Sequence, residues 1–231
     1  MARSRLTVAL VGPDGAGKST ISARLGEATL PAPVKTIYMG VNLEASTLVL
    51  PTTRLLLAAK QARGGRPDLV ASSLRDVEQA TSVSSGSRAS VRSAARMALW
   101  ITEEWFRQLV ALGHGLRGRI VVFDRHFFLD YYHADVETGR RRDLVQRLHG
   151  WMLQRWYPKP DLVIMLDAPA EVLHARKPEA TVAWLERRRQ QYLELGRVVP
   201  EFVVVDVDRP LEAAVSEVLE IIECSWKARN A

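Results

Sequence analysis

The residues with the clearest chemistry lie near the amino terminus, where an apolar run from Leu6 to Val11 leads into Gly12-Pro13-Asp14-Gly15-Ala16-Gly17-Lys18-Ser19-Thr20. This stretch matches the phosphate-binding loop pattern G-x-x-x-x-G-K-[ST] at every specified position. The glycines at 12, 15 and 17 allow positive φ, so successive main-chain N–H groups can turn inward and surround phosphate oxygens. We therefore predict that this loop binds a nucleoside triphosphate.

Individual side chains of the loop have distinct expected roles. Lys18 should reach the β and γ phosphates as a mobile point charge, and the Ser19 hydroxyl should hold Mg²⁺. Thr20 is expected near the α phosphate. A helix that begins at about Lys18 would aim the positive end of its dipole at the same anion. The predicted nucleotide-binding residues are Gly12, Asp14, Gly15, Ala16, Gly17, Lys18, Ser19 and Thr20.

Two other apolar runs end on an acid: Asp124 follows residues 120–123, and Asp167 follows residues 163–166. A carboxylate at such a position can order Mg²⁺ and its waters beside a triphosphate. Asp124 is the favoured candidate because Arg125 follows it and offers a donor fork for a substrate phosphate. The alternative makes Asp124 a helix cap or a turn residue, and for Asp167 the cap is the favoured interpretation.

Composition limits the class of protein. A chain of 231 residues suits one α/β domain with a buried core. The single cysteine, Cys224, cannot form an internal disulfide, which favours a cytoplasmic location, and its place in the last helical stretch predicts a packing role. No run of about 20 apolar residues predicts a membrane span. The net charge of +6 is compatible with nucleic-acid binding, but aromatic residues do not interleave with the basic clusters, so we predict no nucleic-acid partner.

Expected strands and helices alternate along the chain. Each strand is apolar along its whole length, which indicates a parallel sheet covered by helices on both faces. Ligands of such sheets bind beyond the carboxyl ends of the strands. Residues 64–90, rich in Ser, Gly and charge, are expected to form a mobile insertion in a single domain spanning 1–231. Strands are predicted at 6–11, 34–38, 120–123, 161–166 and 202–205, and helices from 18 and at 51–62, 91–112, 143–156 and 210–226.

Five motifs, taken in order and at their spacing, resemble thymidylate kinases: the phosphate-binding loop, residues 124–126 (DRH), 160–167 (PDLVIMLD), 185–192 (LERRRQQY) and 205–211 (VDVDRPL). The similarity covers the first 30 residues and the second half from about residue 119. It implies a P-loop NTPase of the nucleoside monophosphate kinase type, with a five-stranded parallel core and an arginine-bearing lid. It also implies ATP and Mg²⁺ as cofactors.

The resemblance assigns further roles. Asp14 would help to position the acceptor, and Asp124 and Arg125 would face the acceptor and Mg²⁺. The lid would run from about residue 174 to 189, and the loop at 208–210 would pass the adenine. Candidates for stabilising the transferring group are Arg176, Lys177, Arg187, Arg188 and Arg189. The implied catalytic set is Lys18, Asp124, Arg125, Arg176 and Arg187, and the implied metal ligands are Ser19 and Asp124.

The acceptor half of the chain departs from the family pattern. Thymidylate kinases carry Arg-Glu-Pro-Gly-Gly after the second strand, where this chain has residues 38–42 (YMGVN). They also carry Ser and Tyr-Gln beyond the Asp-Arg motif, where this chain has residues 127–132 (FFLDYY). The resemblance therefore predicts ATP as the donor and leaves the acceptor open, with dTMP as one candidate.

Three hypotheses follow. In the first, the protein is a thymidylate kinase-like enzyme that phosphorylates a nucleotide or another phosphorylated small molecule, which Arg125 would clamp together with Arg96. In the second, the acceptor is the hydroxyl of a sugar or nucleoside, and a carboxylate base is required within about 3 Å. The base candidates are Asp124, Asp14, Glu103 and Glu104. In the third, the protein is a non-catalytic nucleotide binder. The first is our prediction, and it leaves a homodimer open.

Overall fold

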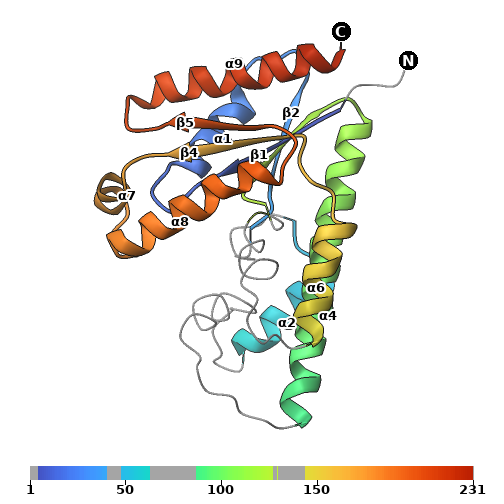
Figure 1. Cartoon of the computed structure of the whole chain (residues 1–231). Coiled ribbons are helices and arrows are strands. Elements are labelled where there is room, and N and C mark those ends of the chain that lie inside the picture. Colours follow the sequence, from blue (N-terminus) through green and yellow to red (C-terminus); the bar gives the residue numbers. More distant parts are fainter. Residues whose placement is uncertain (1–4, 41–47, 63–86, 127–128, 130–143, 231) are drawn as a thin grey trace.

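In the computed structural model, which describes residues 5–40, 48–62, 87–126, 129 and 144–230, five parallel strands form one sheet in the order β2-β3-β1-β4-β5 (Figure 1). The central strand pairs on both sides, because Val8 is in register with Val122 of one neighbour and Leu162 of the other. The predicted strands are confirmed to within one residue at each end. The strands are β1 (Leu6–Val11), β2 (Val34–Tyr38), β3 (Ile120–Asp124), β4 (Leu162–Asp167) and β5 (Phe202–Asp206).

Helices cover both faces of the sheet (Figure 1). On one face, Leu10 packs in a core with Ile21 of α1 (Lys18–Glu27) and Val218 of α9 (Leu211–Asn230). The other face is covered by α4 (Ser87–Leu116), α6 (Leu144–Arg155) and α8 (Val182–Glu194), whose residues pack around Phe123 and Met165. Successive strand side chains point to opposite faces, so continuous apolar strands are what two covered faces require. The remaining elements are α2 (Pro51–Ala62), α7 (Ala170–Arg176) and the short η2 (Leu195–Arg197).

Two expectations about the helical layer are wrong. Helix α4 begins at Ser87 and ends at Leu116, so it is longer at both ends than the predicted 91–112. Residues 87–90 of the expected mobile insertion are therefore helical, and its residues 64–86 lie outside the described residues. Cys224 is exposed, not packed. The buried face of α9 contains Val218, Ile222 and Ser225, and Cys224 falls beside this face.

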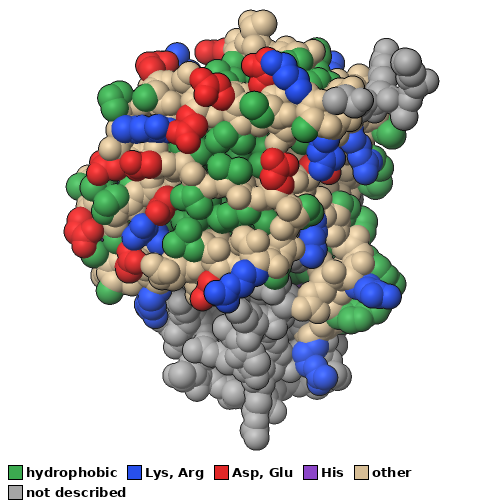
Figure 2. All heavy atoms as spheres, turned by 45° about the horizontal axis from the view of Figure 1, so that its top comes forward, with side chains coloured by type: hydrophobic (Ala, Val, Ile, Leu, Met, Phe, Trp, Pro, Cys, Tyr) green, Lys and Arg blue, Asp and Glu red, His purple; other side chains and the backbone are tan. Residues whose placement is uncertain are grey.

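The surface carries charges of both signs. On the face drawn in Figure 2, Lys and Arg side chains alternate with Asp and Glu, and the positive charge there does not gather into one patch. Among the described residues, the structure contains no helix with the length and apolar character of a membrane span.

Candidate functional site

The phosphate-binding loop joins the central strand β1 to helix α1, and its glycines adopt backbone conformations that other residues rarely take. Gly12, Gly15 and Gly17 have φ values of 143°, 89° and 80°. A Cβ on Gly12 would lie 2.4 Å from the main-chain oxygen of Leu166, and one on Gly15 would lie 2.5 Å from that of Leu173. These carbonyl groups cannot move easily, so both positions require glycine for space as well as for φ.

The lysine of the loop is almost fully buried, with 5% of its surface exposed. Its ammonium donates hydrogen bonds to the main-chain oxygens of Gly12 (2.8 Å) and Pro13 (2.7 Å). The Lys18 side chain therefore folds back over the first residues of the phosphate-binding loop. Ser19 and Thr20 are exposed in the first turn of α1, where main-chain N–H groups lack partners within the helix.

Asp124 ends β3, next to the central strand, and is 9% exposed. Its Oδ1 atom is buried and has no hydrogen-bond partner among the described residues. A buried carboxylate oxygen without a partner is costly unless a cation or water satisfies it. The donor set of an orphaned carboxylate oxygen and an exposed serine hydroxyl fits Mg²⁺, which prefers oxygen ligands and keeps several waters. The described residues hold no group of three or more side chains of the metal-binding types.

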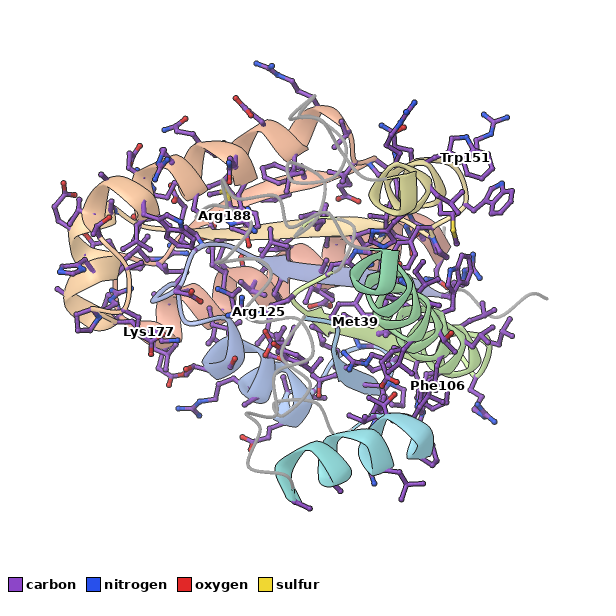
Figure 3. The ribbon with its side chains drawn as sticks, turned by 90° about the horizontal axis from the view of Figure 1, so that it is seen from below. Met39, Phe106, Arg125, Trp151, Lys177 and Arg188 are labelled. Carbon is purple, nitrogen blue, oxygen red and sulfur yellow. The ribbon has the colours of Figure 1, made fainter. Side chains whose placement is uncertain are left out.

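Arg125 follows directly and turns the chain sharply. Its φ of 69° is the single positive value among the described residues other than glycine. Such a conformation costs about 1–2 kcal/mol and persists where the surroundings impose it. The guanidinium forms an ion pair with Asp14 of the loop at 2.9 Å. Arg125 thus links the end of β3 to the loop after β1, at the sheet edge seen in Figure 3.

Charges around Asp14 keep it ionised. Burial raises the pKa of this carboxyl, but the nearby cations Lys18 and Arg125 outweigh burial and hold the pKa below its ordinary value. The site therefore pairs one acid with two basic groups that are both predicted to contact phosphate.

A second part of the site is an open pocket of about 370 Å³ beside the loop. Its wall contains Gly15, Ala16, Gly17 and Thr20 of the loop and α1, together with Arg176 and Arg209. Arg176 donates to the main-chain oxygen of Val207 at 2.9 Å, which holds its stem at the pocket wall. The pocket has the size of an ordinary small-molecule site.

The other predicted lid cations point to different partners. Arg189 grips Asp167 with two hydrogen bonds of 2.7 Å, and its pKa is raised by these bonds. Arg188 lies over the ring of Tyr192, 4.7 Å from its centre. Lys177 pairs with Glu179 at 3.1 Å, and Arg187 is exposed on α8.

The favoured interpretation of Asp167 as a helix cap is wrong. Pro169 precedes the first residue of α7, and the helix has no side-chain cap. The Asp167 carboxylate instead accepts the Arg189 fork from α8. The contact joins residues 22 positions apart, so no local pattern could have predicted it.

Two further candidates for a catalytic base lie in the interior of the described part of the structure. Glu103 and Glu104 are each 1% exposed. Glu103 accepts hydrogen bonds from the Leu50 N–H and the Thr53 hydroxyl, and Glu104 lies 3.2 Å from His149. Both carboxylates already serve as buried partners in the interior.

Sequence reasoning missed Arg107, which is fully buried. The one sequence signal was its i, i+4 spacing from Glu103, a pattern that is also common on exposed helix faces. The predicted clamp residue Arg96 lies in α4, but its side chain is outside the described residues, as are residues 127–128 and 130–132 of the acceptor half.

The sequence of the chain is similar to those of two known proteins over part of their length. A probable thymidylate kinase from Archaeoglobus fulgidus is 33% identical over 113 residues, which cover 46% of this chain and 54% of that protein. A probable thymidylate kinase 1 from Saccharolobus solfataricus is 32% identical over 110 residues, which cover 45% and 54%. The chain thus spans about half the length of the curated relatives it matches. No family model matches the chain.

The structural similarity extends further along the chain. The solved structure of thymidylate kinase from Candida albicans aligns with a TM-score of 0.62 and covers 97% of this chain and 93% of that one, at 17% sequence identity. The chain therefore has a P-loop nucleoside monophosphate kinase fold, and it is thymidylate kinase-like in sequence over about half of its length.

Proposed function

We propose that the protein is an ATP-dependent kinase that transfers the γ-phosphoryl group to a nucleoside monophosphate or another phosphorylated small molecule. One observation supports this above all others: Arg125, a donor fork suited to a phosphate, lies within hydrogen-bond distance of Asp14 in the phosphate-binding loop. Donor and acceptor groups would thereby meet at one edge of the sheet. The names of the relatives make dTMP the first acceptor to test.

Phosphoryl transfer requires mainly positioning and positive charge around a loose transition state. The main-chain amides of the loop would hold the β and γ phosphates. Lys18 would exchange the main-chain oxygens of Gly12 and Pro13 for phosphate oxygens, so that its ammonium stays hydrogen-bonded and gains a partner of opposite charge. Arg176, at the wall of the pocket beside the loop, would supply charge from the lid. Arg187, which is exposed on α8, stays a predicted contributor to that charge.

Mg²⁺ would be held by the Ser19 hydroxyl and, directly or through water, by the Asp124 carboxylate. When bound, it neutralises charge on the β and γ phosphates. The adenine of ATP would occupy the pocket lined by Arg176 and Arg209.

At the acceptor side, Arg125 would bind the acceptor phosphate while Asp14 stays ionised and orients a hydroxyl or base edge of the acceptor. A phosphate oxygen is already nucleophilic, so this reaction needs no base. The hydroxyl-kinase alternative keeps one supporting observation, the orphaned Oδ1 atom of Asp124, which could accept a proton. Homodimer formation and the cytoplasmic location stay predictions.

The test is turnover with ATP and Mg²⁺ across nucleoside monophosphates, nucleosides and sugars, with product detected by mass spectrometry. We expect a monophosphate to be phosphorylated, and we expect Lys18→Ala to lose about 10²- to 10³-fold in kcat. Lys227→Ala removes a paired lysine on the surface of α9 and serves as the matched control. Turnover of hydroxyl acceptors alone would support the alternative, and ATP binding without any turnover would contradict both.

A further inference from the structure

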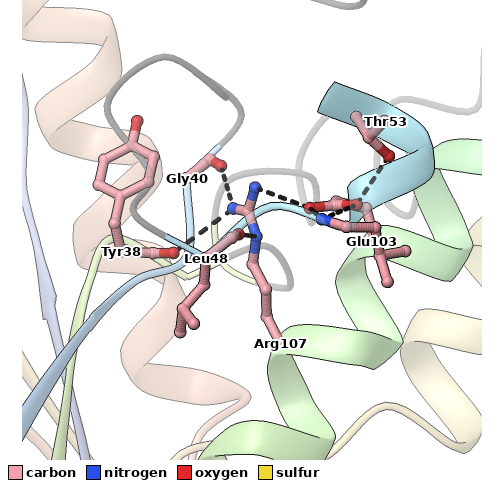
Figure 4. A network of polar contacts seen from close by, with 7 residues as sticks. Tyr38, Gly40, Leu48, Thr53, Glu103 and Arg107 are labelled. Carbon is pink, nitrogen blue, oxygen red and sulfur yellow. Dashed lines mark hydrogen bonds and ion pairs between the residues drawn. The ribbon is translucent and has the colours of Figure 1, made fainter. Parts of the chain in front are cut away.

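Arg107 is a fully buried cation on α4, and Figure 4 shows the polar network around it. Burying a guanidinium is costly unless its N–H groups find acceptors. Desolvation lowers the pKa of Arg107, while the neighbouring Glu103 raises it in partial compensation. The Nη2 atom of Arg107 lies 3.6 Å from Oε1 of the Glu103 carboxylate.

The other donors of Arg107 reach main-chain oxygens at both ends of the segment that connects β2 to α2. Nη1 donates to the oxygens of Tyr38 (3.4 Å) and Gly40 (3.2 Å), and Nε donates to that of Leu48 (3.1 Å). Glu103 accepts from the Leu50 N–H at 3.1 Å, one residue before α2 begins. One ion pair on α4 therefore fixes the main chain on either side of residues 41–47.

One of these fixed positions, Gly40, lies against Arg125, the residue proposed to bind the acceptor phosphate. A Cβ on Gly40 would lie 2.6 Å from Cδ of Arg125 and 2.6 Å from the hydroxyl oxygen of Tyr38. Gly40 thus forms a wall against which the stem of Arg125 packs. The main-chain N–H of Met39 also donates to the oxygen of Asp124 at 3.0 Å, so the end of β2 and the turn at Asp124 and Arg125 are held together.

We propose that Arg107 is a positioning residue for acceptor binding, acting through Gly40 on Arg125. The inference rests on the proposed function, because it assumes that Arg125 binds the acceptor. A bidentate contact between arginine and phosphate tolerates little displacement, and misplacement by about 1 Å can cost about 10²-fold in rate. The fork of Arg107 sets the carbonyl of Gly40, and the wall at Gly40 sets the direction of the Arg125 side chain.

The position of Arg107 predicts an effect on acceptor binding and no effect on ATP binding. Its hydrogen bonds to the oxygens of Tyr38, Gly40 and Leu48 and its ion pair with Glu103 lie on α4 and on the segment before α2, while the pocket beside the phosphate-binding loop is lined by other elements. Loss of the fork should therefore raise the KM of the acceptor and leave the affinity for ATP unchanged. A residue that merely stabilises the fold would affect both substrates in parallel.

The experiment compares Arg107→Lys with Arg117→Lys in the full chain. Lysine keeps the charge but cannot make the forked contacts. Arg117 also donates to a main-chain oxygen, that of Gly113, but it is exposed beyond the end of α4. With dTMP, or the best acceptor of the panel above, we expect Arg107→Lys to raise the acceptor KM about 10- to 100-fold. ATP affinity by calorimetry should stay unchanged, and Arg117→Lys should behave like wild type.

A second variant acts from the other end of the contact chain. Gly40→Ala places its methyl group against the movable side chains of Arg125 and Tyr38, not against main chain, so the fold should accommodate it. It should raise the acceptor KM in the same way, and it decides the question if Arg107→Lys fails to fold. Hydrogen exchange of the amides at 38–40 and 48–53 should speed up in Arg107→Lys alone.

The outcomes separate the two proposals. If wild type phosphorylates no acceptor, the proposed function fails. If wild type is active, and Gly40→Ala and any folded Arg107→Lys keep the wild-type acceptor KM, the positioning role is wrong. Equal loss of ATP and acceptor binding would also overturn it.

Discussion

Asp124 ends β3 next to the central strand, and its Oδ1 atom is buried without a hydrogen-bond partner among the described residues. We expect Asp124→Asn to raise the Mg²⁺ concentration for half-maximal activity about 10- to 100-fold. The substitution removes a negative charge beside the proposed metal site, and changes of this kind weaken metal binding by about that factor. The thermal midpoint should not fall, since the substitution removes a buried charge without a partner.

The measurement is a Mg²⁺ titration of turnover, with a second titration of ATP affinity by calorimetry that does not depend on activity. Glu220→Gln, which neutralises an exposed acid on α9, is the control. An unchanged Mg²⁺ requirement in Asp124→Asn would remove this residue from the metal site.

His126 should make stability depend on pH. The ring is fully buried between Phe123 and Tyr157, and burial lowers its pKa to about 3, from an ordinary value of 6.5. Below pH 6.5 the unfolded chain binds a proton here that the folded chain rejects. Stability is therefore lost as the pH falls from 6.5 toward 3, by up to about 1.4 kcal/mol per pH unit.

Urea unfolding of wild type and His126→Gln at several pH values between about 4 and 7 tests this prediction. That range lies between the two pKa values and just above the higher one. We expect the variant to lose about one proton from the pH dependence of the unfolding free energy. Phe123→Leu damages the same core without removing a titrating group, so it should lower stability and keep the slope. Equal slopes in wild type and His126→Gln would show that His126 is not buried in its neutral form.

At the scale of residues, prediction succeeded where a role depends on neighbours in the chain. The loop glycines adopt positive φ because their spacing already encodes that turn. The pairing of Arg125 with Asp14 joins positions 111 apart, and the burial of Glu103 depends on contacts about 50 residues away. Such contacts follow from tertiary packing, which spacing in one sequence does not reveal.

At the scale of elements, the ion pair between Asp167 and Arg189 fixes helix α8 to the end of β4. Both side chains are largely buried, with 16% and 19% of their surfaces exposed. We expect a double-mutant cycle with Asp167→Asn and Arg189→Lys to give a coupling energy of about 1–2 kcal/mol in urea unfolding. The coupling energy would come from the two parallel hydrogen bonds of the Arg189 guanidinium, because lysine keeps the charge but cannot make both bonds.

The matched control is the pair of Lys177 and Glu179, whose side chains are 43% and 55% exposed. Solvent screens such a pair, so its coupling should stay below about 0.5 kcal/mol. Equal coupling in the two cycles would mean that α8 is held by apolar packing and not by this contact.

The elements themselves were predictable because periodicity reflects burial. Apolar runs such as Ile120 to Phe123 gave the strands, and spacing of the helical type gave α1, α2, α4, α6 and α9. Helices α7 and α8 were not predicted as helices. The start of α4 was missed because Ser87, Arg88 and Ser90 are polar and give little apolar periodicity, and a polar first turn looks like the loop before it. The contact of α8 with β4 was missed for the reason given for Asp167.

At the scale of the molecule, several large apolar side chains of α4 and α6 are exposed. On α4, Leu109, Leu112 and Leu116 are 41–65% exposed. On α6 and just beyond its end, Leu148, Trp151 and Trp156 are 47–58% exposed. The rings of Trp151 and Trp156 meet edge to face at 4.7 Å, and Trp151 points outward in Figure 3. Together these side chains expose on the order of 600 Å² of apolar surface.

That area is close to the roughly 800 Å² that each partner contributes to an ordinary stable interface, so a second copy of the chain is the occupant we expect. Sedimentation equilibrium should then give twice the mass of one chain. The double variant Leu109→Glu and Trp151→Glu should sediment as a monomer, because burying two carboxylates across an apolar interface is costly. Leu211→Glu, at an exposed leucine on α9, should leave the dimer intact. A wild-type protein that stays monomeric at high concentration would contradict the prediction and leave this face to a different partner.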